Sequence, residues 1–98
     1  MTRPPGFDWD SVKREINLKE HRIDFRDAPQ VFDGPHLTWS SSRKGEHRLL
    51  AIGFLEGREV TVVFTSRDGK RRIISIRRAR TYERQALQDA LPRLRSDP

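Results

Sequence analysis

An Asp-Gly pair at residues 68–69 constrains the fold most strongly, because it lies between two segments rich in β-branched residues. Asp-Gly tolerates the positive φ angles of a tight hairpin turn, so the flanking segments "REVTVVFTS" and "KRRIISIRR" should pair antiparallel. The short connection Glu56-Gly57 joins this hairpin to the preceding segment, "HRLLAIGFLE". Three consecutive strands with short turns predict an antiparallel meander.

The N-terminal part of the chain predicts a short strand and a helix. Two aromatic residues alternate around a polar one at residues 7–9, which favours an edge strand. Asp10 then stands where an N-cap would stand, before a helix that should run to about His21. Val12 and Ile16 are spaced four apart and predict the apolar stripe of that helix.

A second helical segment follows, in which Phe25, Ala28 and Phe32 have core-facing spacing. Pro29 fits only in a first turn or at a kink, because it lacks an N–H and clashes with the preceding turn. Residues 37–39 predict another short strand.

Thr81 stands where it could cap a last helix that runs through about Leu91. The predicted fold class is therefore α+β, with two N-terminal helices and a C-terminal helix packed on an antiparallel sheet of about four strands. A length of 98 residues favours a single domain, 1–98. The ends, at 1–6 and 95–98, should be flexible.

Charge narrows the class of partner. Twenty Lys and Arg residues against fourteen Asp and Glu give a formal net charge of +6, which favours RNA, DNA, an anionic membrane or an acidic protein as partner. The alternative is that the excess charge only maintains solubility. The chain has no cysteine, no apolar stretch of a secretion signal and no membrane-spanning run, so a cytoplasmic location is the default.

The last predicted strand carries arginines at both ends. Side chains alternate between the two faces of a strand. The first face should therefore carry Arg72, Ile74, Ile76 and Arg78, and the second face Arg71, Ile73, Ser75 and Arg77. The first face is more apolar and should meet the helices, which leaves the Ser75 face open and positive. Alternatively, the arginines are gatekeepers of an aggregation-prone strand.

A polar line on the first helix is a second candidate site. Lys13, Asn17 and His21 are spaced four apart and could hold a phosphate and move a proton, although the spacing alone favours a solvated helix face. The chain has no metal-binding histidine spacing, glycine-rich phosphate loop or Gly-x-Ser-x-Gly nucleophile motif. The remaining side chains suit RNA cleavage, in which the 2′-hydroxyl of the substrate is the nucleophile.

Four segments together resemble a known family: "FDWDSVKREINLKEH", "VFDGP", "GEHRLLAIG" and "RIISIRRARTYER". In order and spacing they are similar to BrnT, the ribonuclease toxin of a type II toxin–antitoxin pair with a RelE/ParE-like fold. The resemblance covers residues from about Phe7 to Arg84. It implies a small toxin that cleaves RNA without a metal or other cofactor and inhibits translation.

The resemblance also implies a partner, a BrnA-like antitoxin with a DNA-binding domain. Such a pair typically forms a heterotetramer that represses its own operon. The toxin would then contact DNA only through the antitoxin, and no membrane would be involved.

Matched positions give candidate site residues. The expected catalytic residues are His21, Arg48, Arg72, Arg77 and Glu83. Arg72 and Arg77 would hold the scissile phosphate with help from Arg48, and His21 or Glu83 would transfer protons. The expected RNA-binding residues are Lys13, Asn17, Lys19, Arg71, Arg78 and Arg80.

Four positions depart from the family pattern: Glu20 replaces a lysine, Arg22 a glycine, Ile76 a small residue and Leu87 a tyrosine. These departures weaken the expectation of catalytic activity more than the expectation of the fold. The sequence leaves two further functions open. One is a toxin of the same fold that acts on a protein such as DNA gyrase, and the other is a basic nucleic-acid-binding module.

Overall fold

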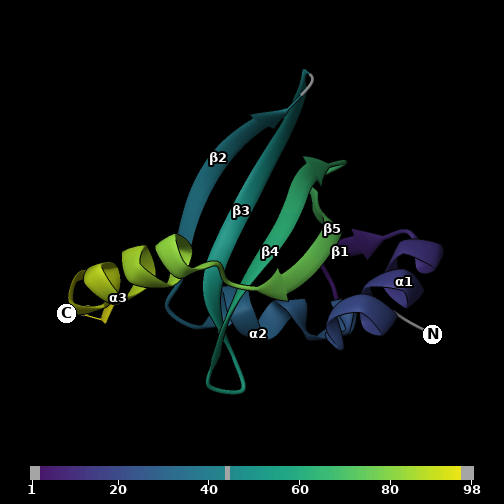
Figure 1. Ribbon diagram of the computed structural model, residues 1–98. Helices are drawn as coiled ribbons and strands as arrows, with labels where there is room; N and C mark the ends of the chain where they lie inside the picture. Colours follow the sequence, from purple (N-terminus) through teal and green to yellow (C-terminus); the bar gives the residue numbers. More distant parts are fainter. Residues whose placement is uncertain (1–2, 44, 96–98) are drawn as a thin grey trace.

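The computed structural model describes residues 3–43 and 45–95, which form one sheet with helices on both faces (Figure 1). The strands are β1 (Phe7–Trp9), β2 (Leu37–Arg43), β3 (Glu46–Leu55), β4 (Arg58–Arg67) and β5 (Lys70–Arg78). The helical elements are α1 (Ser11–His21), the 3₁₀ helix η1 (Phe25–Asp27), α2 (Ala28–Asp33) and α3 (Thr81–Arg95). The predicted α+β class is confirmed.

The meander is confirmed, but the sheet is larger than predicted. Strands β2 to β5 pair antiparallel in chain order, and the two predicted turns have positive φ at Glu56, Gly57, Asp68 and Gly69. The sheet of described residues has five strands in the order β1-β5-β4-β3-β2, and β1 pairs with β5 in parallel. A wholly antiparallel sheet of about four strands was therefore wrong. Parallel partners lie far apart in the chain and leave no turn signal.

One face of the sheet is covered by α1, η1 and α2, and we call it the helix-covered face. Its core includes the following buried side chains: Phe25, Ala28, Val31, Ala51, Val60, Val62, Phe64, Ile73 and Ile76. The predicted core-facing set of β4, at alternate positions from Val60 to Phe64, is confirmed. The second predicted helix is divided into η1 and α2, and Pro29 lies in the first turn of α2, where its missing N–H has no cost.

Helix α1 is turned so that its apolar stripe faces solvent, which the sequence did not predict. Val12 is 63% exposed and Ile16 is 49% exposed. Asn17 is buried instead, and its amide group donates to the carbonyl oxygens of Ile23 and Ile76, each at 3.0 Å, and accepts from the Ile76 N–H at 3.1 Å. These bonds fix α1 on β5. A stripe of two apolar residues is too narrow to determine which side of the helix is buried. The predicted N-cap is confirmed, since Asp10 accepts from Val12 N–H.

The opposite face carries a smaller core under α3. Ile52, Ala79 and Leu87 are buried there, with Trp39 packed against them. Helix α3 begins at Thr81, so this residue is the first of the helix and not its cap, and it ends at Arg95, a turn beyond the predicted end. Figure 1 shows α3 on the β2–β3 side of the sheet, so α3 leaves the β5–β1 side of this face uncovered. We call it the open face.

Half of the residues in the predicted flexible ends, 1–6 and 95–98, lie outside the described part of the chain. Of the remainder, residues 3–6 lead through a turn into β1. No helix within the described ranges has the length and apolar character needed to cross a membrane.

Candidate functional site

A β-bulge in β5 decides which side chains reach the open face. Val63 of β4 pairs with Ser75, and the next residue, Phe64, pairs with Ile73. Ile74 is therefore an extra residue on β5 without a direct partner on β4. A bulge of this kind shifts the alternation of the strand by one residue.

The bulge changes the predicted faces of β5. Ile73 and Ile76 are both buried in the core of the helix-covered face, although strict alternation assigned them to opposite faces. Arg72, Ser75 and Arg77 pair with β4 residues of the open face and share that face with them. The predicted grouping of Ile74 with Ile76 was wrong, and the two arginines that alternation separated lie on one side of the sheet.

The open face is hollowed next to the start of α3, and we call this hollow the arginine pocket. Its volume is about 270 Å³. Six of its lining side chains are polar: Ser41, Arg48, Ser75, Arg77, Arg80 and Tyr82. Leu50 and Val63 supply its apolar lining. These residues come from four strands and from the segment where β5 passes into α3, so distant parts of the sequence build the pocket.

A buried carboxylate holds Arg77 in place. Glu83 is 0% exposed and accepts from both terminal nitrogens of Arg77, at 2.7 and 3.0 Å. It also accepts from Thr61 Oγ1 at 3.0 Å and from the Arg80 N–H at 2.7 Å. Burial raises the pKa of Glu83, but the hydrogen bonds from Arg77, Arg80 and Thr61 outweigh it and hold the pKa below its usual value. Glu83 is therefore an ionised partner that orients Arg77.

This environment leaves Glu83 unsuited to proton transfer. A general base must reach the substrate with a free lone pair, and both carboxylate oxygens already accept from protein groups. Its position in the third residue of α3 also caps the helix, because it accepts from the N–H that precedes the helix. Sequence matching gave Glu83 as a catalytic residue, which stays a prediction, and could not show that it lies buried beneath Arg77.

Arg72 extends the positive surface toward β1. It forms an ion pair with Asp8, which lies directly opposite it in the parallel pairing of β1 with β5. Phe7 and Trp9 are buried in the helix-covered core, so Asp8 between them points to the open face. Arg72 thus shares a face with Arg77 but does not line the arginine pocket.

His21 and Arg78 lie in a separate hollow of about 480 Å³. That hollow is also lined by Leu55 and Val60, which belong to the core of the helix-covered face. The sheet therefore separates His21 from Arg77. The sequence grouped these residues because matched positions carry no information about faces.

The other predicted RNA-binding residues are distributed over the surface. Lys13 and Lys19 are exposed on α1, whereas Asn17 is buried and its amide is used inside the protein. The guanidinium carbon of Arg71 lies 4.3 Å from the ring centre of Phe32, on the helix-covered side. Within this predicted set, Arg80 is the residue that joins the arginine pocket.

Sequence reasoning missed Tyr82 and His47. Tyr82 lines the arginine pocket, and His47 lines an adjoining hollow with Arg48, Thr65 and Ile74. The sequence signal for His47 was its position beside Arg48 at the start of a strand. Residues 3–43 and 45–95 contain no group of three or more His, Asp or Glu side chains arranged to hold a metal ion.

A family model described as the ribonuclease toxin, BrnT, of a type II toxin–antitoxin system matches residues 9–83. The chain belongs to this family. The matched range contains Arg48 and Arg77 of the arginine pocket and ends at Glu83, so it includes the buried ion pair. No curated protein matches the chain. The family relation that the sequence motifs indicated is confirmed, whereas the RelE/ParE-like fold stays a prediction.

Proposed function

We propose that this BrnT-family protein is a toxin that cleaves RNA at the arginine pocket. One observation carries the proposal. Arg48 from β3 and Arg77 and Arg80 from the end of β5 and the segment after it line a single pocket in a member of a ribonuclease toxin family. Guanidinium groups bind phosphate through fixed, directional donors, so this arrangement suits the RNA backbone.

The reaction needs no nucleophile from the protein. A base removes the proton from a ribose 2′-hydroxyl, the 2′-oxygen attacks the adjacent phosphorus, and the bond to the 5′-oxygen breaks as that oxygen takes up a proton. The products are a 2′,3′-cyclic phosphate and a 5′-hydroxyl. Negative charge increases on the phosphate oxygens in the transition state, so fixed cations lower the barrier without a metal ion.

The arginines have different roles in this mechanism. Arg77 is held by two hydrogen bonds to Glu83 and is thus oriented before RNA arrives. Arg48, from β3, and Arg80, from the segment between β5 and α3, add further charge to the pocket lining. Arg72 contacts the RNA strand beyond the scissile phosphate, and Glu83 acts as a positioning residue.

For proton transfer we propose His47. It shares a hollow with Arg48, whereas His21 lies across the sheet. We expect His47→Ala to lower the rate about 100-fold, the contribution of a general acid or base. His21→Ala is the matched control and should leave the rate within about twofold. A large loss in His21→Ala with little loss in His47→Ala would show that His21 transfers the proton instead.

The test of the function is RNA cleavage by the purified protein in the presence of EDTA. Wild type should cut and leave cyclic-phosphate ends, and Arg48→Ala should cut at least 100-fold more slowly, because a lost transition-state donor has about this effect. Intact RNA with wild type, or inhibition of DNA supercoiling without RNA cleavage, would contradict the proposal.

The family also supports an antitoxin partner. We propose that a BrnA-like DNA-binding antitoxin covers the arginine pocket with acidic and aromatic side chains, which complement its charge. The pair would act in the cytoplasm, form a heterotetramer and repress its operon through the antitoxin's DNA-binding domain. Co-purification with the product of the neighbouring gene should abolish cleavage. A complex that still cuts RNA would contradict this interface.

A further inference from the structure

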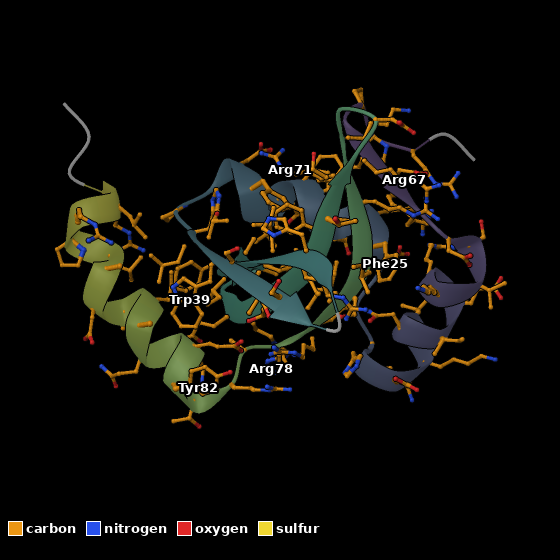
Figure 2. All side chains as sticks on the ribbon, turned by 90° about the horizontal axis from the view of Figure 1, so that it is seen from above. Phe25, Trp39, Arg67, Arg71, Arg78 and Tyr82 are labelled. Carbon is orange, nitrogen blue, oxygen red and sulfur yellow. The ribbon has the colours of Figure 1, made fainter. Side chains whose placement is uncertain are left out.

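Two aromatic rings stack at the rim of the arginine pocket. The rings of Trp39 and Tyr82 are nearly parallel, with an interplanar angle of 10° and 6.2 Å between centroids, which is the geometry of an offset stack. Figure 2 shows both on the same side of the molecule, Trp39 from β2 and Tyr82 from the first turn of α3. The stack joins the edge of the sheet to the helix that follows β5.

The two rings differ in burial. Trp39 packs against the core under α3, so its position is explained by the fold. Tyr82 is 57% exposed and has one face toward Trp39. The other large exposed apolar residues of the described chain are Val12, Ile16 and Leu18, all on α1. Tyr82 is thus the exposed aromatic ring of this set, and it lines the arginine pocket.

We propose that Tyr82, supported by Trp39, is a platform on which a base of single-stranded RNA stacks. The inference rests on the proposed function and adds the way in which the substrate is held. A phosphate among Arg48, Arg77 and Arg80 would bring its nucleotide to the rim where Tyr82 lies. Proteins that bind single strands combine these two elements, a cationic groove for the backbone and an aromatic face for a base.

The geometry specifies what the platform recognises. Trp39 fixes the plane of Tyr82, so a third ring can continue the stack with little loss of side-chain freedom. Stacking uses the π face that every base has, and it tolerates different sequences. A duplex would not fit, because its bases are stacked on one another. The ring of Tyr82, and not its hydroxyl, is therefore the feature that matters.

The experiment measures binding of a short 2′-O-methyl RNA oligonucleotide, which cannot be cleaved because its 2′-oxygens are blocked. Trp9→Phe leaves Trp39 as the single tryptophan of the chain, so quenching of its fluorescence reports occupancy beside Tyr82. In this background Tyr82→Ala should weaken binding by about 5- to 150-fold, the range for one lost stacked base. Tyr82→Phe should stay within about twofold.

An abasic series separates stacking from a general disturbance of the site. Bases are removed from the oligonucleotide one at a time. At one position the removal should weaken binding to wild type but leave the affinity of Tyr82→Ala unchanged. Thermal unfolding confirms that both variants are folded, and Tyr82→Leu keeps an apolar contact with Trp39 if the alanine variant is unstable. Equal affinity of wild type and Tyr82→Ala, or a loss that is independent of any base, would overturn the platform.

Its failure can be told apart from failure of the proposed function. Tyr82-dependent binding without cleavage of unmodified RNA would support the platform and contradict the ribonuclease. Cleavage that Tyr82→Ala leaves unchanged would support the ribonuclease and overturn the platform. A Trp39 signal that responds to the antitoxin but not to the oligonucleotide would also overturn it, because the aromatic pair would then be a protein-binding surface.

Discussion

The two faces of the sheet are built from the same strands but are used differently. The helix-covered face is closed by α1, η1 and α2 and buries a continuous apolar core. The open face is covered by α3 over only part of its area and carries the arginine pocket. Strand β5 supplies Ile73 and Ile76 to the first and Arg72 and Arg77 to the second. The single extra residue Ile74 shifts the alternation of β5, so that these isoleucines and arginines lie on opposite faces.

The ion pairs of the open face repeat this contrast on a smaller scale. Glu83 is fully buried beneath Arg77, whereas Asp8 and Arg72 are both partly exposed. A buried charge that loses its partner is costly, and an exposed one is solvated by water. The pairs should therefore respond very differently to the same substitution.

Glu83→Ala should have the largest effect on stability. It leaves the Arg77 guanidinium partly buried without a counter-charge and removes the acceptor of Thr61, so we expect a loss of about 3–5 kcal/mol in the free energy of unfolding. Asp8→Ala is the matched control and should cost less than about 1 kcal/mol. Urea denaturation measures both. Equal losses would show that Glu83 is not the buried support described above.

Asn17→Ala should rank second. It removes the amide that bridges Ile23 and Ile76 and leaves buried backbone groups unpaired, so unfolding should become easier by about 2 kcal/mol. Lys13→Ala, one turn earlier on the solvent side of α1, should change stability by less than about 0.5 kcal/mol. If Asn17→Ala were neutral and impaired RNA binding, the residue would belong to the RNA surface after all.

Asp24 should make the free energy of unfolding depend on pH in the acid range. Hydrogen bonds from Arg14 lower its pKa strongly, against the effect of burial, and Arg26 adds to them. Because the folded pKa lies below the unfolded value, this contribution is complete above the unfolded pKa of about 3.8 and declines as the pH falls from there through the folded pKa. Asp24→Asn should lower the free energy of unfolding by about 1 kcal/mol at neutral pH. It should also reduce the fall in this free energy as the pH drops below about 4. Urea denaturation at several acid pH values measures this, and the same pH dependence in Asp24→Asn as in wild type would contradict the role of Asp24.

The smallest effect is expected on the exposed stripe of α1. Ile16→Ser removes an apolar side chain that is half exposed, so the free energy of unfolding should change by less than about 0.5 kcal/mol. A loss of 2 kcal/mol or more in urea denaturation would mean that Ile16 packs against the core.

The elements that sequence reasoning predicted well are those with local causes. The turn at Asp68, the N-cap at Asp10 and the first-turn position of Pro29 each depend on the conformational preferences of a few neighbouring residues. Family motifs singled out Arg48 and Arg77, which both line the arginine pocket, and their catalytic role stays a prediction. These features needed no knowledge of which segments meet in space.

The features that were missed depend on contacts between distant segments. The bulge at Ile74 is set by the pairing of β5 with β4, and strict alternation has no means of placing it. Asn17 is buried because backbone groups of β5 accept and donate to it, which no helical periodicity reveals. Tyr82 reaches the pocket because α3 folds back over the sheet next to Trp39.

The most direct test of the account compares two neighbouring residues, Arg77 and Arg78. They are adjacent in sequence and face opposite sides of the sheet, and Arg77→Lys and Arg78→Lys both keep the net charge. Lysine preserves the ion pair with Glu83 but loses the planar two-point contact of arginine. RNA cleavage should fall at least tenfold in Arg77→Lys and stay within about twofold of wild type in Arg78→Lys. Equal losses, or a loss confined to Arg78→Lys, would contradict the claim that RNA is cleaved on the open face.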